Sequence, residues 1–363
     1  DFGTWFYRAL ALLVIACPCS LVISTPVTVV SGIGAAARRG VLVKGGEALE
    51  AAGGLRALLF DKTGTLTEGR PVLERVLALR GTREEALALA AALERRSEHP
   101  LAHAMLSAAG ERPLPEVAGF RSIPGRGAEG EVRGRRYTVG SPALFAERGV
   151  SLEAALPALR EVERAGETPV VLGDGAGPIA VFGLADAVRP EAPEAIRALR
   201  EEGVEELVML TGDAEAPARR VAGLLGIGYR ARLRPEEKVA AVRERVARHG
   251  AAGMVGDGVN DAPALAAASV GFAMGAAGSD AALEVADVAL MHDDLRRLAG
   301  AVRLSRAARR AIKQNILASV LVKGLFVALA PFGLVTLWLA VLADMGTSLG
   351  VTLNGLRLFA GRW

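Results

Sequence analysis

The chain has 363 residues, of which 51% are hydrophobic, and its formal net charge at pH 7 is only +3. The length is sufficient for two or three domains, and the weak charge gives no support to nucleic-acid binding. A mean hydropathy of +0.32 is high for a soluble protein and indicates membrane-spanning segments. Because the sequence opens with Asp1 and a hydrophobic segment begins almost at once, we interpret it as the C-terminal part of a longer protein.

The first predicted element is a membrane-spanning helix over residues 9–30, which contain no charged side chain. At about 1.5 Å per residue, a helix of this length crosses the hydrocarbon core of a bilayer. The spacing of Cys17 and Cys19 disfavours a disulfide and suits two metal ligands. Pro18 and Pro26 free backbone carbonyl groups, which is tolerated where the helix faces protein or a cavity. We therefore predict an intramembrane ion site; the alternative is two buried cysteines that act as small apolar residues.

Residues 55–60 form a short apolar run that predicts a buried strand, and the motif Asp-Lys-Thr-Gly-Thr-Leu-Thr comes next at residues 61–67. Ligands bind at the carboxyl ends of strands in open α/β sheets. A carboxylate at that position, Asp61, can attack a phosphorus atom and form an aspartyl-phosphate. Lys62 either compensates its charge or is a solvated neighbour. The alternative role of Asp61 is to cap a helix.

Residues 70–178 lack the pattern of a strand followed by Asp and indicate an inserted domain. Helical periodicity over residues 84–96 leads into a Ser-Glu-His-Pro sequence that contains His99. Residues 125–130 form a Gly-x-Gly-x-x-Gly motif, which alone is weak evidence because a turn between strands produces the same pattern. His103 lies after His99 at a spacing that two helical zinc ligands could use, a second interpretation of this segment.

Strand signals resume at residues 179–184, and apolar strands then alternate with helices to about residue 300. This alternation predicts an α/β fold with a doubly wound parallel sheet, from which the insert projects. Polar residues come after the predicted strands or lie in the helices between them: Thr211, Asp213, Lys238, Asp257, Asn260 and Asp261.

These polar residues match the requirements of phosphoryl transfer, which needs neutralisation of the phosphoryl oxygens and a Mg²⁺ ion held by hard oxygen ligands. Thr211 and Lys238 can contact the phosphoryl group. The Mg²⁺ ligands would be Asp61, the carbonyl of Thr63 and Asp257, with Asn260 hydrogen-bonding nearby and Asp213 and Asp261 as lesser candidates. The alternative for each residue, taken singly, is a solvated loop residue.

Two further membrane spans are predicted at residues 316–335 and 334–353, after a basic stretch at residues 303–313 that is typical of a cytoplasmic membrane edge. This arrangement places residues 35–313 and the C-terminus in the cytoplasm. Each span carries one charged residue, Lys323 or Asp344. A charge inside a membrane is costly and indicates function, although a purely structural salt bridge between the two is the alternative.

The motif at residues 61–67 resembles the phosphorylation motif of P-type ATPases. Their soluble relatives, the haloacid-dehalogenase-like phosphatases, have a second Asp as general acid/base where this chain has Thr63, so the phosphoenzyme should form and persist. Cys-Pro-Cys is similar to the mid-membrane signature of the heavy-metal (type IB) pumps. Lys323 and the Asp-x-Gly at Asp344 resemble the zinc/cadmium/lead group, whereas copper pumps have Asn, Tyr, Met and Ser in these spans. Met345 is a soft side chain that slightly weakens the case against copper.

This resemblance implies roles for further residues. Glu94 and His99 would contact the adenine side of ATP, and Gly125 and Gly127 would let the backbone approach the nucleotide. The transported ion would be held by Cys17, Cys19 and Asp344, with Lys323 as the counter-charge.

The resemblance also implies a domain order, with a haloacid-dehalogenase-like phosphorylation domain, an inserted α+β nucleotide-binding domain and transmembrane α-helices. The expected segments are 1–42, the first transmembrane helix with its cytoplasmic extension; 43–69 and 179–302, the two parts of the phosphorylation domain; 70–178, the nucleotide-binding domain; and 303–363, two C-terminal transmembrane helices.

The implied function is ATP-driven export of Zn²⁺, Cd²⁺ or Pb²⁺ by a multi-pass protein of the cell membrane, with Mg²⁺ as cofactor and no nucleic-acid partner. The family also has further N-terminal spans and an actuator domain with a Thr-Gly-Glu sequence, which this sequence does not contain, so the missing N-terminal portion is an expected partner. The alternatives are a Cu(I) exporter of the same family and a fragment that only binds ATP and autophosphorylates.

Overall fold

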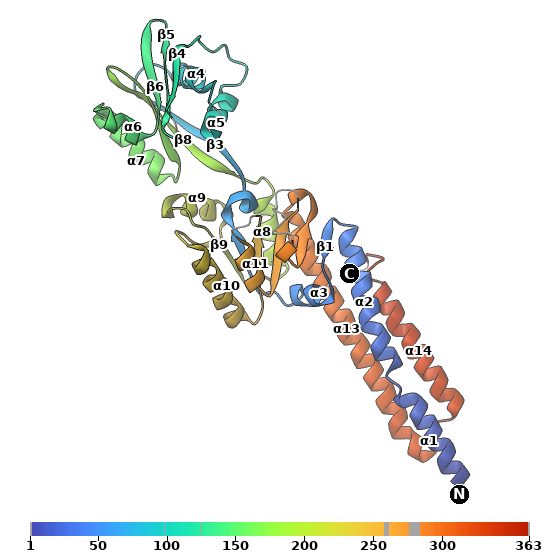
Figure 1. Ribbon diagram of the computed structural model, residues 1–363. Coiled ribbons are helices and arrows are strands. Elements are labelled where there is room, and N and C mark those ends of the chain that lie inside the picture. The colour runs from blue at the N-terminus through green and yellow to red at the C-terminus, as the bar shows by residue number, and fades with distance from the viewer. Residues whose placement is uncertain (1, 98, 124, 258–260, 276–283, 362–363) are drawn as a thin grey trace. The chain divides into compact units, whose positions relative to one another are not determined.

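The structure, a computed structural model, describes residues 2–97, 99–123, 125–257, 261–275 and 284–361 (Figure 1). Residue contacts divide the chain into two compact units, one of residues 1–60, 191–208 and 235–363 and one of residues 61–190 and 209–234. The division falls inside two continuous strands, β2 (Ala57–Asp61) and β9 (Glu206–Leu210), which are described here with the sheet in which they pair.

The first sheet has seven strands in the order β1-β13-β12-β11-β2-β9-β10. Strand β11 is parallel to both β12 and β2, and β1 is an antiparallel edge strand. Every residue of β2, β11 and β12 is buried, as is typical of parallel strands that are covered on both faces. The predicted doubly wound parallel sheet is therefore confirmed. The other strands are β1 (Val41–Val43), β10 (Gly228–Arg230), β11 (Ala252–Gly256), β12 (Val270–Met274) and β13 (Val288–Leu290).

Two of the helices that accompany these strands begin or end at residues that are common at helix ends. Helix α8 (Ala192–Glu201) has Pro in its first turn, where the missing N–H costs nothing. Helix α9 (Glu215–Leu225) ends at Gly226 in a left-handed conformation, a common helix stop. The remaining helices of this group are α3 (Gly46–Ala52), α10 (Pro235–His249) and α11 (Ala262–Ala267).

The second sheet has six antiparallel strands in the order β3-β8-β7-β6-β5-β4. Helices α4 (Arg83–Glu94) and α5 (Pro100–Ala109) share one apolar core with the sheet, and α7 (Leu156–Arg164) contributes to another. The remaining elements are β3 (Thr67–Ala78), β4 (Ala118–Ile123), β5 (Gly127–Val132), β6 (Arg135–Gly140), β7 (Thr168–Asp174), β8 (Gly177–Val188) and α6 (Pro142–Glu147).

One strand lies in a different sheet from the one expected. Residues 179–184 were expected in the parallel sheet, but they lie in β8 and pair with β3 and β7. Both faces of this strand are buried, because its side chains enter the two apolar cores of the six-stranded sheet. This is why the run is apolar throughout. A continuous apolar strand is thus not always a strand of a parallel sheet.

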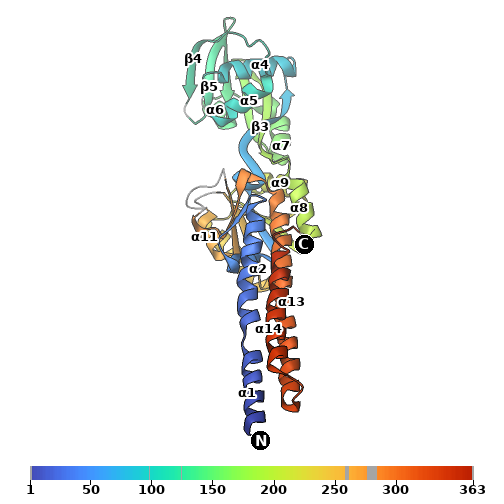
Figure 2. The same ribbon diagram turned by 90° about the vertical axis from the view of Figure 1, so that its right-hand side faces the viewer.

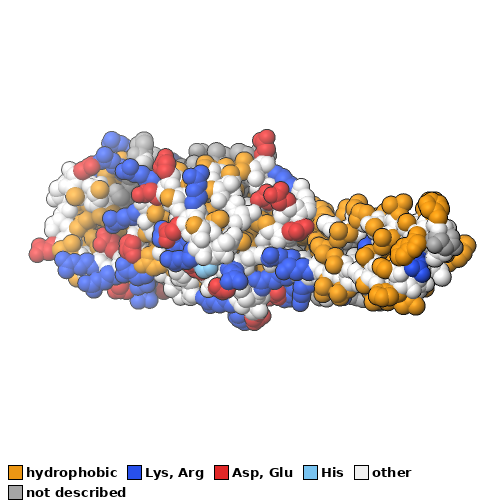
Figure 3. Space-filling model, turned by 90° about the horizontal axis from the view of Figure 1, so that it is seen from below, with side chains coloured by type: hydrophobic (Ala, Val, Ile, Leu, Met, Phe, Trp, Pro, Cys, Tyr) orange, Lys and Arg blue, Asp and Glu red, His pale blue; other side chains and the backbone are white. Residues whose placement is uncertain are grey.

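Four helices form the apolar bundle: α1 (Phe2–Ala16), α2 (Cys19–Ala37), α13 (Arg296–Leu329) and α14 (Leu337–Leu356). Helices α2, α13 and α14 lie side by side in both ribbon views (Figures 1 and 2). On the face shown in Figure 3, hydrophobic side chains cover most of this bundle. Its surface is therefore suited to lipid rather than water.

The first predicted span is divided in two. The helix stops before Pro18, which has no N–H to donate, and Cys17 and Pro18 form a break between α1 and α2, whereas Pro26 is accommodated within α2. At the other end, α13 is one helix that includes the predicted basic stretch and residues 316–329 of the predicted span. It ends just before Pro331, and Gly333 adopts a left-handed φ of 73° in the link to α14.

Candidate functional site

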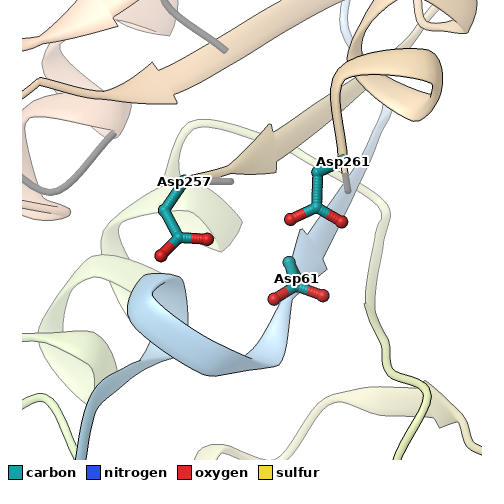
Figure 4. A group of neighbouring side chains, drawn as sticks. All are labelled: Asp61, Asp257 and Asp261. Carbon is teal, nitrogen blue, oxygen red and sulfur yellow. The ribbon is translucent and has the colours of Figure 1, made fainter. Parts of the chain in front are cut away.

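Three carboxylates meet at one edge of the seven-stranded sheet. Asp61 is the last residue of β2, while Asp257 and Asp261 come after the adjacent parallel strand β11. One oxygen from each carboxylate lies within 4.8 Å of the others, and the three groups gather beyond the strand ends (Figure 4). Like charges this close repel each other unless a cation or proton neutralises them. Carboxylate oxygens are the ligands that Mg²⁺ prefers, so the group fits that ion.

The structure pairs Lys238 with this carboxylate group. Its Nζ atom lies 2.9 Å from Oδ1 of Asp261, and both side chains are largely buried. Helix α10 thus brings a compact ammonium group to the sheet edge, where it could also contact a phosphoryl group. Asp261, considered a lesser candidate from the sequence, is a full member of the group, whereas Asn260 lies outside the described residues.

Thr211 comes directly after β9, the strand on the other side of β2. The backbone N–H of Glu206, at the start of β9, donates to the carbonyl of Arg56 just before β2 (3.1 Å), so the two strands begin together. Thr211 and Asp61 therefore lie at the same ends of neighbouring strands. Thr63 lies in the turn after Asp61, where Gly64 takes a φ of 72° that few other residues adopt.

The six-stranded sheet and its helices enclose a cavity of about 280 Å³. All four residues that the resemblance assigned to the nucleotide line it: Glu94, His99, Gly125 and Gly127. They come from the end of α4, the start of α5 and the turn between β4 and β5. The cavity thus brings together residues from two motifs that are far apart in sequence.

An ion pair joins charged residues of two neighbouring helices of the bundle. Nζ of Lys323, in α13, lies 3.1 Å from Oδ1 of Asp344, in α14. The same ammonium group donates a hydrogen bond to the carbonyl oxygen of Cys17, at the break between α1 and α2. The break therefore places a cysteine backbone beside the only charges that the two predicted spans carry.

Comparisons with known proteins agree with this geometry. The sequence pattern of the haloacid dehalogenase-like hydrolases matches residues 55–269. The chain is 46% identical over 370 residues to a probable cadmium-transporting ATPase of Alkalihalophilus pseudofirmus, an alignment that covers 99% of this chain and 51% of the relative. It is 44% identical to a zinc/cadmium/lead-transporting P-type ATPase of Escherichia coli, with coverage of 99% and 48%.

The crystal structure of a zinc-transporting PIB-type ATPase in its E2.Pi state superposes with a TM-score of 0.92. The two are 42% identical over 99% of this chain and 59% of the other. The chain belongs to the heavy-metal (type IB) P-type ATPases. It spans about half the length of the curated relatives it matches.

A P-type ATPase of this kind is a multi-pass membrane protein. Three helical segments of the chain are long and apolar enough to cross a bilayer: Phe2–Ala37, Arg296–Phe332 and Leu337–Leu356. They flank the catalytic region, which matches the hydrolase pattern.

Two of the polar side chains that line the cavity, Glu94 and His99, have identifiable hydrogen-bond partners. Burial raises the pKa of the Glu94 carboxyl, and a hydrogen bond with Ser97 and the charge of His99 oppose that rise. Nδ1 of His99 accepts a hydrogen bond from the Leu101 backbone N–H (3.2 Å). Nε2 is therefore the ring nitrogen left to contact a ligand.

The two glycines of the ATPase's loop serve different purposes. Gly125 has a φ of 69° and open space around it. At Gly127, where φ is 153°, an added Cβ would lie 2.0 Å from the carbonyl oxygen of Val139. Gly127 thus allows close packing against β6, and Gly125 allows a left-handed turn at the mouth of the cavity.

The cysteine prediction needs a correction. The spacing of Cys17 and Cys19 was expected to disfavour a disulfide, but the structure joins them in one. The two Cα atoms lie 5.5 Å apart, within the usual range for disulfides. In an unbroken helix the two side chains would point to nearly opposite sides, and the break at Pro18 removes that constraint on their direction. Binding of a metal ion by both sulfurs therefore requires the reduced pair.

Two residues that position the phosphorylation loop were missed. Asp186, at the end of β8, accepts a hydrogen bond from Thr67 (2.5 Å) and lies 3.9 Å from Lys62. Arg189 donates to the carbonyl oxygens of Gly64 (2.8 Å) and Thr65 (3.0 Å). In the sequence, the feature that could have indicated these two residues is the group of charged side chains just after the long apolar run of β8.

Lys62 itself is buried and also pairs with Asp213. Its interpretation as a solvated neighbour is therefore wrong. The carboxylates of Asp186 and Asp213 compensate the charge of this ammonium group.

Proposed function

We propose that the full-length protein exports a divalent heavy-metal ion, Zn²⁺, Cd²⁺ or Pb²⁺, and drives this export by ATP through an aspartyl-phosphate at Asp61. The main support for a divalent ion as the transported species is the Lys323–Asp344 pair beside Cys17. An anionic carboxylate with cysteine sulfurs suits a borderline divalent ion better than Cu(I), which prefers sulfur ligands alone.

In the proposed reaction an Oδ atom of Asp61 attacks the γ-phosphorus of ATP, and the bond to the β-phosphate oxygen breaks as ADP leaves. Thr211 and Lys238 would neutralise and orient the phosphoryl oxygens. Mg²⁺ would be held by Asp61, Asp257 and the Thr63 carbonyl, with Asp261 close to them. When bound, the ion offsets the negative charge of the phosphate oxygens.

The cavity of the six-stranded domain would take the adenine end of ATP. The Nε2–H of His99 would donate to a ring nitrogen, and Glu94 would contact the exocyclic amino group. Neither side chain would take part in the chemical step, because the phosphoryl-handling groups lie at strand ends of the other sheet.

Replacing His99 by Ala is expected to weaken ATP binding by about 1–3 kcal/mol, because a hydrogen bond to the base and the cap of α5 are lost together. His103→Ala is the matched control, since this histidine is exposed on the same helix and does not line the cavity. Calorimetric titration of the chain with ATP measures both. If the two substitutions changed ATP affinity equally, His99 would not be a nucleotide-binding residue.

The export proposal is tested by metal-stimulated ATP hydrolysis in the full-length protein. We expect stimulation by Zn²⁺, Cd²⁺ or Pb²⁺ and little by Cu(I) under reducing conditions. Stimulation by Cu(I) alone would favour the copper exporter. An absence of stimulation by any of these ions would favour a module that only binds ATP and phosphorylates itself.

A further inference from the structure

The nucleotide cavity has one basic side chain that the proposed binding mode does not use. Arg126 lies between the two glycines of the loop and lines the cavity. Among the described residues around the cavity it is the only Lys or Arg, and Glu94 supplies a carboxyl group. A nucleotide with several negative charges would therefore meet a single guanidinium group among the described residues that line this cavity.

The backbone of Arg126 is held in place. Its carbonyl oxygen accepts from the Ser141 N–H (2.9 Å), and its N–H donates to the Ile123 carbonyl oxygen (3.0 Å). The loop packs so closely on Gly140 that an added Cβ there would lie 2.3 Å from the same carbonyl oxygen. Only the side chain of Arg126 is free to change position.

That side chain now pairs with Glu147, the last residue of α6. Both side chains are about half exposed, and Glu147 does not line the cavity. An exposed ion pair of this kind contributes little stability because water and salt screen it. The guanidinium group can thus exchange partners at low cost.

We propose that Arg126 leaves Glu147 and binds the phosphate chain of the nucleotide, so that this domain distinguishes nucleotides by their phosphates and not only by their base. The inference depends on the proposed function, in which the cavity holds the nucleotide. A guanidinium group forms two parallel hydrogen bonds with the oxygens of a phosphate. The exposed carboxylate of Glu147 is a weaker competitor for the Arg126 guanidinium group than a bound phosphate chain. Glu147 holds the side chain in position while the cavity is empty.

The test compares binding of ATP, ADP, AMP and adenosine to the full chain by calorimetric titration in EDTA, which also prevents phosphorylation. In Arg126→Gln, we expect ATP and ADP to bind about tenfold more weakly through loss of a charge-assisted contact, while adenosine changes less than about twofold. Added salt should narrow the difference between ATP and adenosine in the wild type more than in this variant.

Two further variants sharpen the result. Glu147→Gln should bind ATP a few-fold more tightly, because the guanidinium group has lost its competitor. Arg121→Gln is the control, since Arg121 is exposed in the same sheet, pairs with Glu129 and does not line the cavity.

An equal loss for adenosine and ATP in Arg126→Gln, or no loss for either, would overturn the inference, as would weaker ATP binding in Glu147→Gln. The proposed function fails in a different way: wild-type protein would then bind neither adenosine nor ATP.

Discussion

Replacement of Asp61 by Asn is expected to lower phosphorylation of the chain by ATP at least about 10³-fold, to background. The amide has no anionic oxygen with which to attack the γ-phosphorus, and neighbouring residues do not replace a lost nucleophile. The measurement is acid-stable incorporation of radiolabelled phosphate. Retention of wild-type labelling would mean that another residue is the acceptor.

This loss can be separated from misfolding. Asp61 lies within 4.8 Å of two other carboxylates, so its neutral replacement reduces repulsion and should leave thermal stability unchanged or slightly raised. Nucleotide binding at the separate cavity should also be kept. Glu153→Gln is the control, because it removes an exposed carboxylate that is not part of the group.

Replacement of Asp344 by Ala is expected to abolish zinc-stimulated ATP hydrolysis in the full-length protein. The substitution removes the only carboxylate ligand proposed for the ion and leaves Lys323 as a positive charge that repels it. Thr347→Ala is the matched control, since Thr347 lies one turn further along α14 and its hydroxyl only donates to the Ala343 carbonyl oxygen.

In Asp344→Ala the Lys323 ammonium group loses its carboxylate partner, which also destabilises the fold. Breaking a fully buried pair costs about 3–5 kcal/mol, and the cost for this part-buried pair should be lower. The double variant Lys323→Ala/Asp344→Ala removes that charge and should restore stability without restoring the response to zinc. Full stimulation by zinc in either variant would contradict the role of Asp344 as an ion ligand.

The sheet edge was the most predictable part of the molecule. Short apolar strands that lead directly into Asp61, Thr211 and Asp257 leave few alternatives, because the carboxyl ends of parallel strands meet at one edge of the sheet. The cavity residues were predictable only through the resemblance, since nothing in the spacing of His99 and Gly125 shows that their segments meet.

The errors have physical causes. Strand β8 was misplaced because apolar cores on both of its faces produce the same sequence pattern as a parallel strand. Residues 9–30 were predicted as one continuous helix, because hydropathy measures the length of a span and not its continuity. The break at Pro18 also explains the Cys17–Cys19 disulfide, which regular helical geometry would not favour.

The fate of the phosphate is the most direct test of the account as a whole. Thr63 has no carboxylate with which to activate water, and general-base assistance is worth about 10²–10⁴-fold in rate. The chain should be labelled with radioactive ATP, chased with unlabelled ATP, and divided into samples treated with acid or hydroxylamine. We predict a label that persists through the chase, survives acid and is released by hydroxylamine, as an acyl phosphate on Asp61 would be. Rapid, sustained release of phosphate during the chase would contradict the account, because it would show that another group, such as Asp261, acts as the base.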